Sequence, residues 1–118
     1  MTRESYQGSC QCGAVQYDVS VDLDETYTCN CSRCQRMGFV LAFSDLGSFN
    51  LNAGEKNLTE FLFNKKTIRH LFCRTCGVES FAYGTMPDGT KTVAVNVNCL
   101  EDVNPRQLSS RQIDGKSY

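Results

Sequence analysis

The sequence predicts a mainly β domain, made of small antiparallel sheets with at most one or two short helices. Short segments that alternate apolar and polar residues recur along the chain, and this period of two is typical of half-buried strands. Turn signals rich in Gly, Asn, Asp and Pro separate these segments. The length of 118 residues corresponds to a single domain.

The expected elements follow one another at short intervals. The segment 13–21 alternates apolar and polar residues and predicts a half-buried strand, whereas the apolar run 39–43 suits a strand buried on both faces. Further strands are expected, in order, at 49–51, 58–63, 67–72, 80–84 and 92–98, with turns at 52–55 and 87–90. Two stretches, 32–37 and 102–110, favour short helices. The polar C-terminal tail, 106–118, is expected to be loosely held.

Charge and hydropathy exclude several classes of protein. Twelve Lys and Arg residues against 13 Asp and Glu residues give a net charge of −1, which does not favour binding to a nucleic-acid backbone. No apolar stretch approaches the ~20 residues of a membrane-spanning helix, and the polar residues 1–7 lack the pattern of a signal peptide. We therefore expect a cytoplasmic or nuclear protein without nucleic-acid or membrane partners. Exposed sheet edges are compatible with a homodimer.

Cysteine carries most of the functional information. Seven of the eight cysteines form a first cluster (Cys10, Cys12), a middle cluster (Cys29, Cys31, Cys34) and a third cluster (Cys73, Cys76). Such short spacings bring several thiolates within reach of one ion, and Zn²⁺ is the usual ion for sulfur ligands. A disulfide framework is the alternative, but Cys-x-Cys pairs cannot bond to each other without strain and no secretory signal is visible. The clusters therefore predict metal binding.

Spacing alone leaves two ways to divide these seven ligands. One joins Cys31 and Cys34 to the third cluster, as in a zinc ribbon, although the intervening segment is longer than usual. The other joins the first cluster to the third and leaves the middle cluster as a local trio, whose closure costs little chain entropy. Four thiolates would make a closed structural zinc site, whereas three leave one coordination position for a ligand.

The three clusters and their flanking residues resemble one protein family. Its motifs are matched in order and at similar intervals by Gly8-Ser9-Cys10-Gln11-Cys12-Gly13, Cys29-Asn30-Cys31-Ser32-Arg33-Cys34 and Cys73-Arg74-Thr75-Cys76-Gly77. This pattern is similar to that of the glutathione-dependent formaldehyde-activating enzyme family, which includes the centromere protein V domain. The resemblance covers residues 5–105 as one domain and implies a β-tent fold around zinc. Asn30 departs from the His expected there in many members.

The resemblance selects one division of the ligands and implies a reaction. Cys10, Cys12, Cys73 and Cys76 would hold a structural zinc, and Cys29, Cys31 and Cys34 a second, catalytic zinc, giving two Zn²⁺ per chain. The implied activity is that of a carbon–sulfur lyase resembling S-hydroxymethylglutathione synthase. Such an enzyme forms or cleaves the adduct between glutathione, or a similar thiol, and formaldehyde, or a related aldehyde. Zinc supports this chemistry because it ionises a bound thiol.

Two other functional hypotheses remain at this level. The first is a non-catalytic, zinc-stabilised protein-binding module, which would need only the closed four-cysteine site. The second, ranked last, is a thiol-based redox or metal-buffering role for the middle cluster. The middle cluster's third cysteine and the absence of a basic stripe favour the enzyme.

Several residues outside the clusters have two interpretations each. His70 is either a proton carrier or an ordinary strand histidine facing solvent or a polar neighbour, and the second is favoured. Cys99 is expected to be a small buried residue rather than a ligand. Certain cations either bind glutathione carboxylates or face solvent: Arg33, Arg36, Lys65, Lys66 and Arg69. Certain aromatic residues either line a pocket above the second zinc or belong to the core: Phe39, Phe43, Phe61 and Tyr83.

Overall fold

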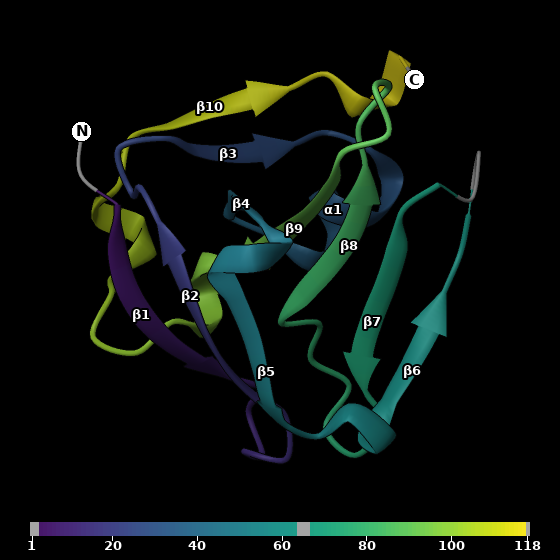
Figure 1. The fold of residues 1–118 in the computed structure, drawn as a ribbon. Coiled ribbons are helices and arrows are strands. Elements are labelled where there is room, and N and C mark those ends of the chain that lie inside the picture. Colours follow the sequence, from purple (N-terminus) through teal and green to yellow (C-terminus); the bar gives the residue numbers. More distant parts are fainter. Residues whose placement is uncertain (1–2, 64–66, 118) are drawn as a thin grey trace.

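The structure, a computed structural model, describes residues 3–63 and 67–117. Within these residues, ten strands form one sheet of three strands and one of seven (Figure 1). One short α-helix and several 3-10 turns connect them. The predicted mainly β class with small sheets and at most one or two short helices is confirmed.

The three-stranded sheet is antiparallel and has the order β1-β2-β5. Its strands are β1 (Glu4–Ser9), β2 (Gln16–Val21) and β5 (Phe49–Ala53). The alternation predicted for β2 is present, because its inward residues Tyr17 and Val19 are each 1% exposed while Asp18 and Ser20 are half-buried. One face of this sheet therefore belongs to the core.

The seven-stranded sheet has the order β10-β3-β4-β9-β8-β7-β6. Its neighbouring strands are antiparallel except for β10, which runs parallel to β3. The strands are β3 (Thr26–Cys29), β4 (Leu41–Asp45), β6 (Leu58–Phe61), β7 (Arg69–Cys73), β8 (Phe81–Thr85), β9 (Lys91–Asn96) and β10 (Ser110–Ile113).

The hydrophobic core lies where the two sheets meet. Tyr17 of β2, Phe49 of β5 and Phe81 of β8 form an aromatic cluster, with ring centroids 4.9–5.6 Å apart. Val93 and Val95 of β9 are fully buried in the same cluster of side chains. Offset and tilted aromatic contacts of this kind add to the free energy gained from burial, so both sheets depend on the same core.

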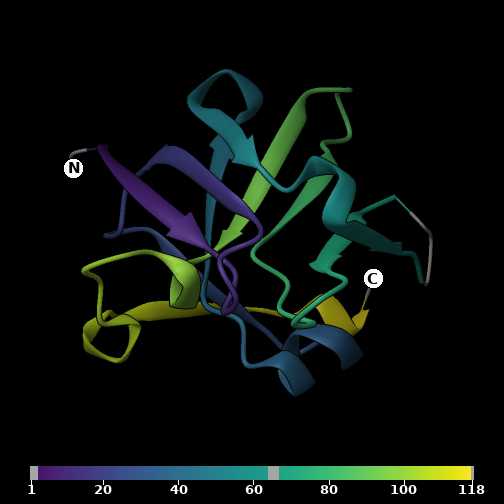
Figure 2. The same ribbon diagram turned by 90° about the horizontal axis from the view of Figure 1, so that it is seen from below.

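The helix predicted at 32–37 is confirmed as α1 (Ser32–Met37). Cys31 caps its start, because the Cys31 Sγ accepts a hydrogen bond from the backbone N–H of Cys34. Gly38 ends the helix with a left-handed φ of 70°, a conformation that glycine adopts without steric cost. Figure 2 shows α1 and the C-terminal turn on the same side of the molecule.

The second predicted helix, at 102–110, is wrong. Asp102 has a φ of 61°, which breaks a right-handed helix, and only a 3-10 turn forms at Pro105–Gln107 before β10 begins. The tail is also better ordered than expected, because β10 pairs with β3 along four residues. The sequence of β10 is polar because the strand lies at a sheet edge and is largely exposed. The sequence therefore does not indicate that this segment is a strand.

Two of the predicted strands differ in detail. The segment 13–21 becomes a strand only from Gln16, because residues 10–15 form a turn. The run 39–43 is not buried on both faces: in β4 Ala42 is fully buried, whereas Phe43 is 45% exposed. In the part of the chain that the structure describes, no helix is long and apolar enough to cross a membrane.

Substitution of Gly54, with Gly89 as the control, tests how closely the residue after β5 packs against the turn before β2. Both have a left-handed φ, 94° and 89°. A Cβ on Gly54 would collide with the Ala14 carbonyl oxygen, whereas a Cβ on Gly89 would have nothing within 4 Å. Gly89→Ala should therefore lower the free energy of unfolding by only the ~1–2 kcal/mol of a left-handed residue. Gly54→Ala should lower it by a further ~1–3 kcal/mol for overpacking.

Urea unfolding of the metal-loaded variants measures this difference. Equal losses in the two variants would contradict the close contact between Gly54 and the turn at 14–15.

Candidate metal centres

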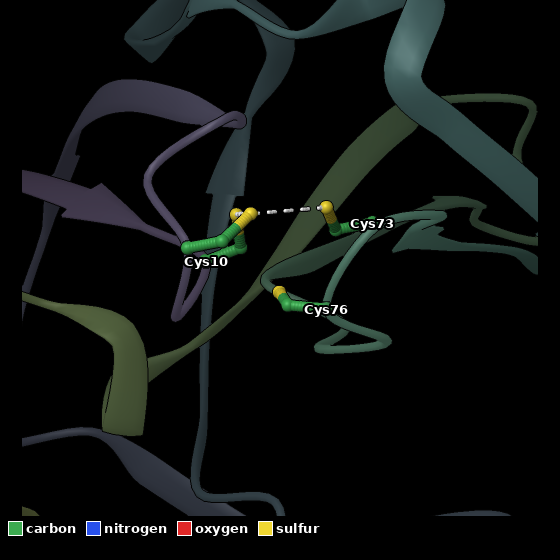
Figure 3. A group of neighbouring side chains, drawn as sticks. Cys10, Cys73 and Cys76 are labelled. Carbon is green, nitrogen blue, oxygen red and sulfur yellow. Dashed lines mark hydrogen bonds between the residues drawn. The ribbon is translucent and has the colours of Figure 1, made fainter.

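Two cysteine turns face each other across the two sheets. Cys10 follows β1 of the three-stranded sheet, and Cys73 is the last residue of β7 in the other sheet. Each turn is closed by a glycine directly after its second cysteine: the N–H of Gly13 donates to the Cys10 carbonyl, and the N–H of Gly77 to the Cys73 carbonyl. Both glycines have a left-handed φ, 83° and 80°. The turns direct the labelled sulfur atoms toward one another (Figure 3).

The four sulfur atoms of the first and third clusters fit one zinc ion. They all lie within 4.8 Å of one another. Tetrahedral Zn²⁺ with Zn–S bonds of about 2.3 Å places its sulfur ligands about 3.8 Å apart. Cys12 Sγ lies 3.7 Å from both Cys10 Sγ and Cys73 Sγ. N–H groups support the sulfur atoms: Val15 N lies 3.3 Å from Cys10 Sγ, and Asn57 Nδ2 lies 3.3 Å from Cys73 Sγ.

The surroundings of Cys73 favour its thiolate. Burial raises the pKa of the Cys73 thiol, but hydrogen bonds from the backbone N–H groups of Cys76 and Thr75 and from the Cys12 side chain outweigh burial. The net pKa is lowered to about 6. Because the thiolate is the form that binds metal, this environment suits a metal ligand.

The middle cluster forms a second group, at the end of β3 and the start of α1. The Sγ atoms of Cys29, Cys31 and Cys34 lie within 4.8 Å of one another. Cys31 N donates to Cys29 Sγ at 3.5 Å, and Cys34 N donates to Cys31 Sγ at 3.3 Å. Burial raises the pKa of Cys31, but hydrogen bonds with the backbone N–H groups of Cys34 and Arg33 and with the side chains of Cys34 and Cys29 together outweigh burial, so its net pKa is lowered. Within residues 3–63 and 67–117, no fourth Cys, His, Asp or Glu joins this trio.

The sulfur atoms therefore form two groups. The first and third clusters together make one group, and the middle cluster makes the other. The zinc-ribbon division, with Cys31 and Cys34 beside the third cluster, is not the one that the structure forms. Cys99 belongs to neither group; it is half-buried in the 3-10 turn Val97–Cys99, and burial raises the pKa of its thiol. All eight cysteines are free of disulfides.

A buried polar network connects the two cysteine groups. The Glu79 side chain is 3% exposed and lies just after the third-cluster turn. Its Oε1 accepts hydrogen bonds from Arg33 Nε at 3.0 Å and Arg33 Nη2 at 2.8 Å, and its Oε2 lies 2.7 Å from His70 Nδ1. Arg33 belongs to α1 between two trio cysteines, whereas His70 belongs to β7. One carboxylate thus holds α1, β7 and the third-cluster loop together.

This network assigns His70 and Arg33 to structure rather than to ligand binding. A carboxylate paired with a guanidinium accepts hydrogen bonds, so His70 Nδ1 carries the proton and donates to Glu79. Glu79 is the polar neighbour expected for His70. Arg33 is also stacked over the Phe61 ring, 4.7 Å from its centroid, so its guanidinium is already occupied. Glu79 was not among the residues selected from the sequence. A carboxylate between the apolar residues Val78 and Phe81 is the pattern that could have indicated a buried polar residue there.

The remaining cations divide between surface and fold. Arg36 is exposed on α1 and donates to the Ser32 carbonyl within the same helix. Arg69 pairs with Glu60 and lies over the Tyr83 ring, on the strands β6 to β8. Lys65 and Lys66 lie outside the described residues.

The four aromatic candidates do not gather in one pocket. Phe39 is buried, Phe43 contacts Tyr27, and Phe61 lies under Arg33. Tyr83 packs against Phe49 and Phe81 and lines a surface groove that contains none of the trio cysteines. These rings belong mainly to the fold.

The fold and the two cysteine groups define a mainly β domain with two candidate metal centres whose donors suit zinc. Comparison with known families assigns it more closely. Residues 5–113 match the family described as glutathione-dependent formaldehyde-activating enzyme, abbreviated GFA. The chain belongs to this family, as its cysteine motifs indicated.

A solved structure shares the fold. The chain is similar to a protein of Rhodobacter sphaeroides whose crystal structure is known, with 34% sequence identity and a TM-score of 0.81. The similarity covers 91% of this chain and 99% of the other. The fold therefore extends over nearly the whole length of both proteins.

Removal of the Glu79 carboxylate should be costly. Glu79→Ala would leave a largely buried guanidinium and a buried imidazole N–H without their partner, and the loss of one partner of a buried ion pair typically costs about 3–5 kcal/mol. Glu60→Ala is the matched control, because it removes a carboxylate from the exposed pair with Arg69, where the expected loss is below about 1 kcal/mol. Chemical denaturation of both metal-loaded variants measures the difference. A loss for Glu79→Ala as small as that for Glu60→Ala would contradict the structural role of the network.

Proposed function

We propose that this protein is a zinc-dependent carbon–sulfur lyase-type enzyme. It forms or cleaves an S-hydroxymethyl adduct between glutathione, or a similar thiol, and formaldehyde, or a related aldehyde. The first and third clusters hold a structural zinc, and the trio holds a second, catalytic zinc. The observation that carries the proposal is the trio itself: three convergent sulfur donors, without a fourth protein donor among the described residues, in a member of the GFA family.

The donor count gives the two sites different chemistry. Four thiolates complete the coordination of Zn²⁺ and make a site that stabilises the fold. Three thiolates leave a position for an exchangeable ligand, as in catalytic zinc sites. Zn²⁺ bound by the trio would supply a Lewis acid that lowers the pKa of a thiol substrate.

The reaction transfers no electrons to or from an outside acceptor. In the forming direction, the sulfur electron pair of the thiol makes a new carbon–sulfur bond to the aldehyde carbon. The π pair of the carbonyl moves to oxygen, and that oxygen takes up the proton lost by the thiol. Cleavage is the reverse: the hydroxyl loses its proton, the carbonyl re-forms, and the carbon–sulfur pair leaves with sulfur.

The protein residues around the trio serve mainly to hold its sulfur atoms. The backbone N–H groups of Cys31 and Cys34 donate to the sulfur atoms of Cys29 and Cys31 and help to hold them in place. Arg33 is held by Glu79, which fixes α1 but leaves this guanidinium unsuited to a substrate carboxylate. Arg36, exposed on the same helix, is the cation of α1 that remains suited to a carboxylate of a thiol such as glutathione.

Metal content tests the two-site proposal. Protein purified anaerobically with zinc should contain close to two zinc ions per chain by elemental analysis. Cys34→Ser should fold and contain one, because it removes a trio ligand, whereas the control Cys99→Ser should retain two. Cys73→Ser should fail to fold stably, since it breaks the closed site, and bound structural zinc contributes roughly 10–16 kcal/mol in small domains.

Two results would contradict this division of roles. One is a wild-type protein that binds a single zinc even after supplementation. The other is equal unfolding of Cys34→Ser and Cys73→Ser.

Exchange spectroscopy tests the reaction. NMR of formaldehyde mixed with glutathione should show faster exchange between free thiol and adduct when zinc-loaded protein is added. The acceleration should be lost in Cys34→Ser and retained in Cys99→Ser. No acceleration by a protein that carries two zinc ions would instead favour the zinc-stabilised binding module.

A further inference from the structure

The C-terminal strap, defined here as residues 113–117, lies directly against the trio. Ile113 pairs with Cys29 at the end of the parallel β10–β3 ladder. Beyond it, the Gly115 backbone comes so close to Cys29 that a Cβ on Gly115 would lie 2.5 Å from the Cys29 Sγ and 3.2 Å from the Cys31 Cβ. The strap therefore forms one wall of the trio, and only a residue without a side chain fits at this position.

Asn30 holds the strap in place through hydrogen bonds. It stands between Cys29 and Cys31 in the chain, and both ends of its side-chain amide bind the strap. Its Nδ2 donates to Asp114 Oδ1 at 2.9 Å, and its Oδ1 accepts from the Lys116 N–H at 2.9 Å. Its backbone N–H also donates to the Ile113 carbonyl at 3.2 Å. Three hydrogen bonds thus converge on one residue.

The three trio sulfur atoms differ in what holds them. Cys31 and Cys34 are fixed by the first turn of α1, whose cap includes the Cys31 sulfur. Cys29 lies outside the helix, and the backbone hydrogen bond that its sulfur accepts is long, 3.5 Å from Cys31 N. The close approach of the Gly115 backbone is a further restraint on this sulfur atom, from outside the middle cluster. The orientation of Cys29 therefore depends on the strap more than that of its two partners does.

We propose that Asn30 is a positioning residue for the trio. Its hydrogen bonds hold the strap in place, so that the Gly115 backbone keeps the Cys29 sulfur directed toward the sulfur atoms of Cys31 and Cys34. The strap also shields this side of Cys29, so a thiol ligand reaches the trio from a side that Gly115 does not cover. The inference rests on the trio being the second zinc site of the proposed function, but neither of its readouts requires the reaction.

The test compares two matched variants, Asn30→Ala and Asn50→Ala. Asn50 makes the same kind of exposed amide–carboxylate bond, to Asp18 at 3.0 Å, on β5 and away from the trio. Graded chelator competition on zinc-loaded protein should show that Asn30→Ala weakens the more labile zinc roughly tenfold or more, in the range usual for outer partners of metal ligands. Asn50→Ala should match the wild type.

The second readout is the alkylation of Cys29. Iodoacetamide labelling followed by peptide mass spectrometry should show faster modification of Cys29 in Asn30→Ala than in Asn50→Ala. The exposed Cys12 of the other site serves as an internal reference and should react alike in both. An Asn30→Ala protein with the zinc affinity and the Cys29 reactivity of Asn50→Ala would overturn the proposal.

Gly115→Ala tests the contact from the other side. Its methyl group must displace either the strap or the Cys29 sulfur, so the labile zinc should weaken while the four-cysteine zinc is retained. Unchanged zinc affinity in this variant would show that the wall is not formed as described and would also overturn the proposal. A wild-type protein with one zinc would defeat the proposed two-zinc function, whereas Cys29 labelling would still decide whether Asn30 fastens the strap.

Discussion

The architecture depends on the meeting of two cysteine turns from different sheets. The first turn joins β1 to β2 in the three-stranded sheet, and the second joins β7 to β8 in the seven-stranded sheet. Cys12 and Cys73 are 61 residues apart in the chain, yet their sulfur atoms lie 3.7 Å from each other. A domain of this size has a limited core. A metal ion bound by both turns would therefore add to the stability of the contact between the two sheets, which the aromatic cluster also holds together. The loop that follows the second turn then carries Glu79 to α1.

The sequence was most informative where structure is local. A few adjacent residues specify each of three features: the turn glycines, the helix α1 and the seven clustered cysteines. The spacing of the cysteines also indicates metal binding. The strands β1, β3 and β10 escaped prediction. β1 and β10 lie at sheet edges and are largely exposed, and β3 has only four residues, so none of the three carries a regular apolar period. Spacing also could not divide the cysteines, since the division depends on which sheets the turns join.

The residues around the candidate sites were harder to predict than the cysteines. Arg33 and Glu79 are 46 residues apart, and Asn30 and Asp114 are 84 residues apart. Each pair exists only because the completed sheets bring its members together, and an isolated Arg, Glu, Asn or Asp in a sequence is usually a surface residue. Arg33, one of the five cations considered for binding a substrate carboxylate or facing solvent, instead holds a helix in place through Glu79. Charge near a cysteine cluster is therefore a poor guide to ligand binding until its partner is known.

The position of β10 has a consequence for how the trio is assembled. The three cysteines lie within six residues of one another, so they can gather around an ion as soon as this short segment has been synthesised. Their covering wall comes from more than 80 residues further along the chain, since Lys116 binds Asn30 across 86 positions. A nascent chain thus presents the trio uncovered during much of its translation, and contacts of such long range form late in folding. Capture of a metal ion by the trio and enclosure of the trio would in this way be separate events, in that order.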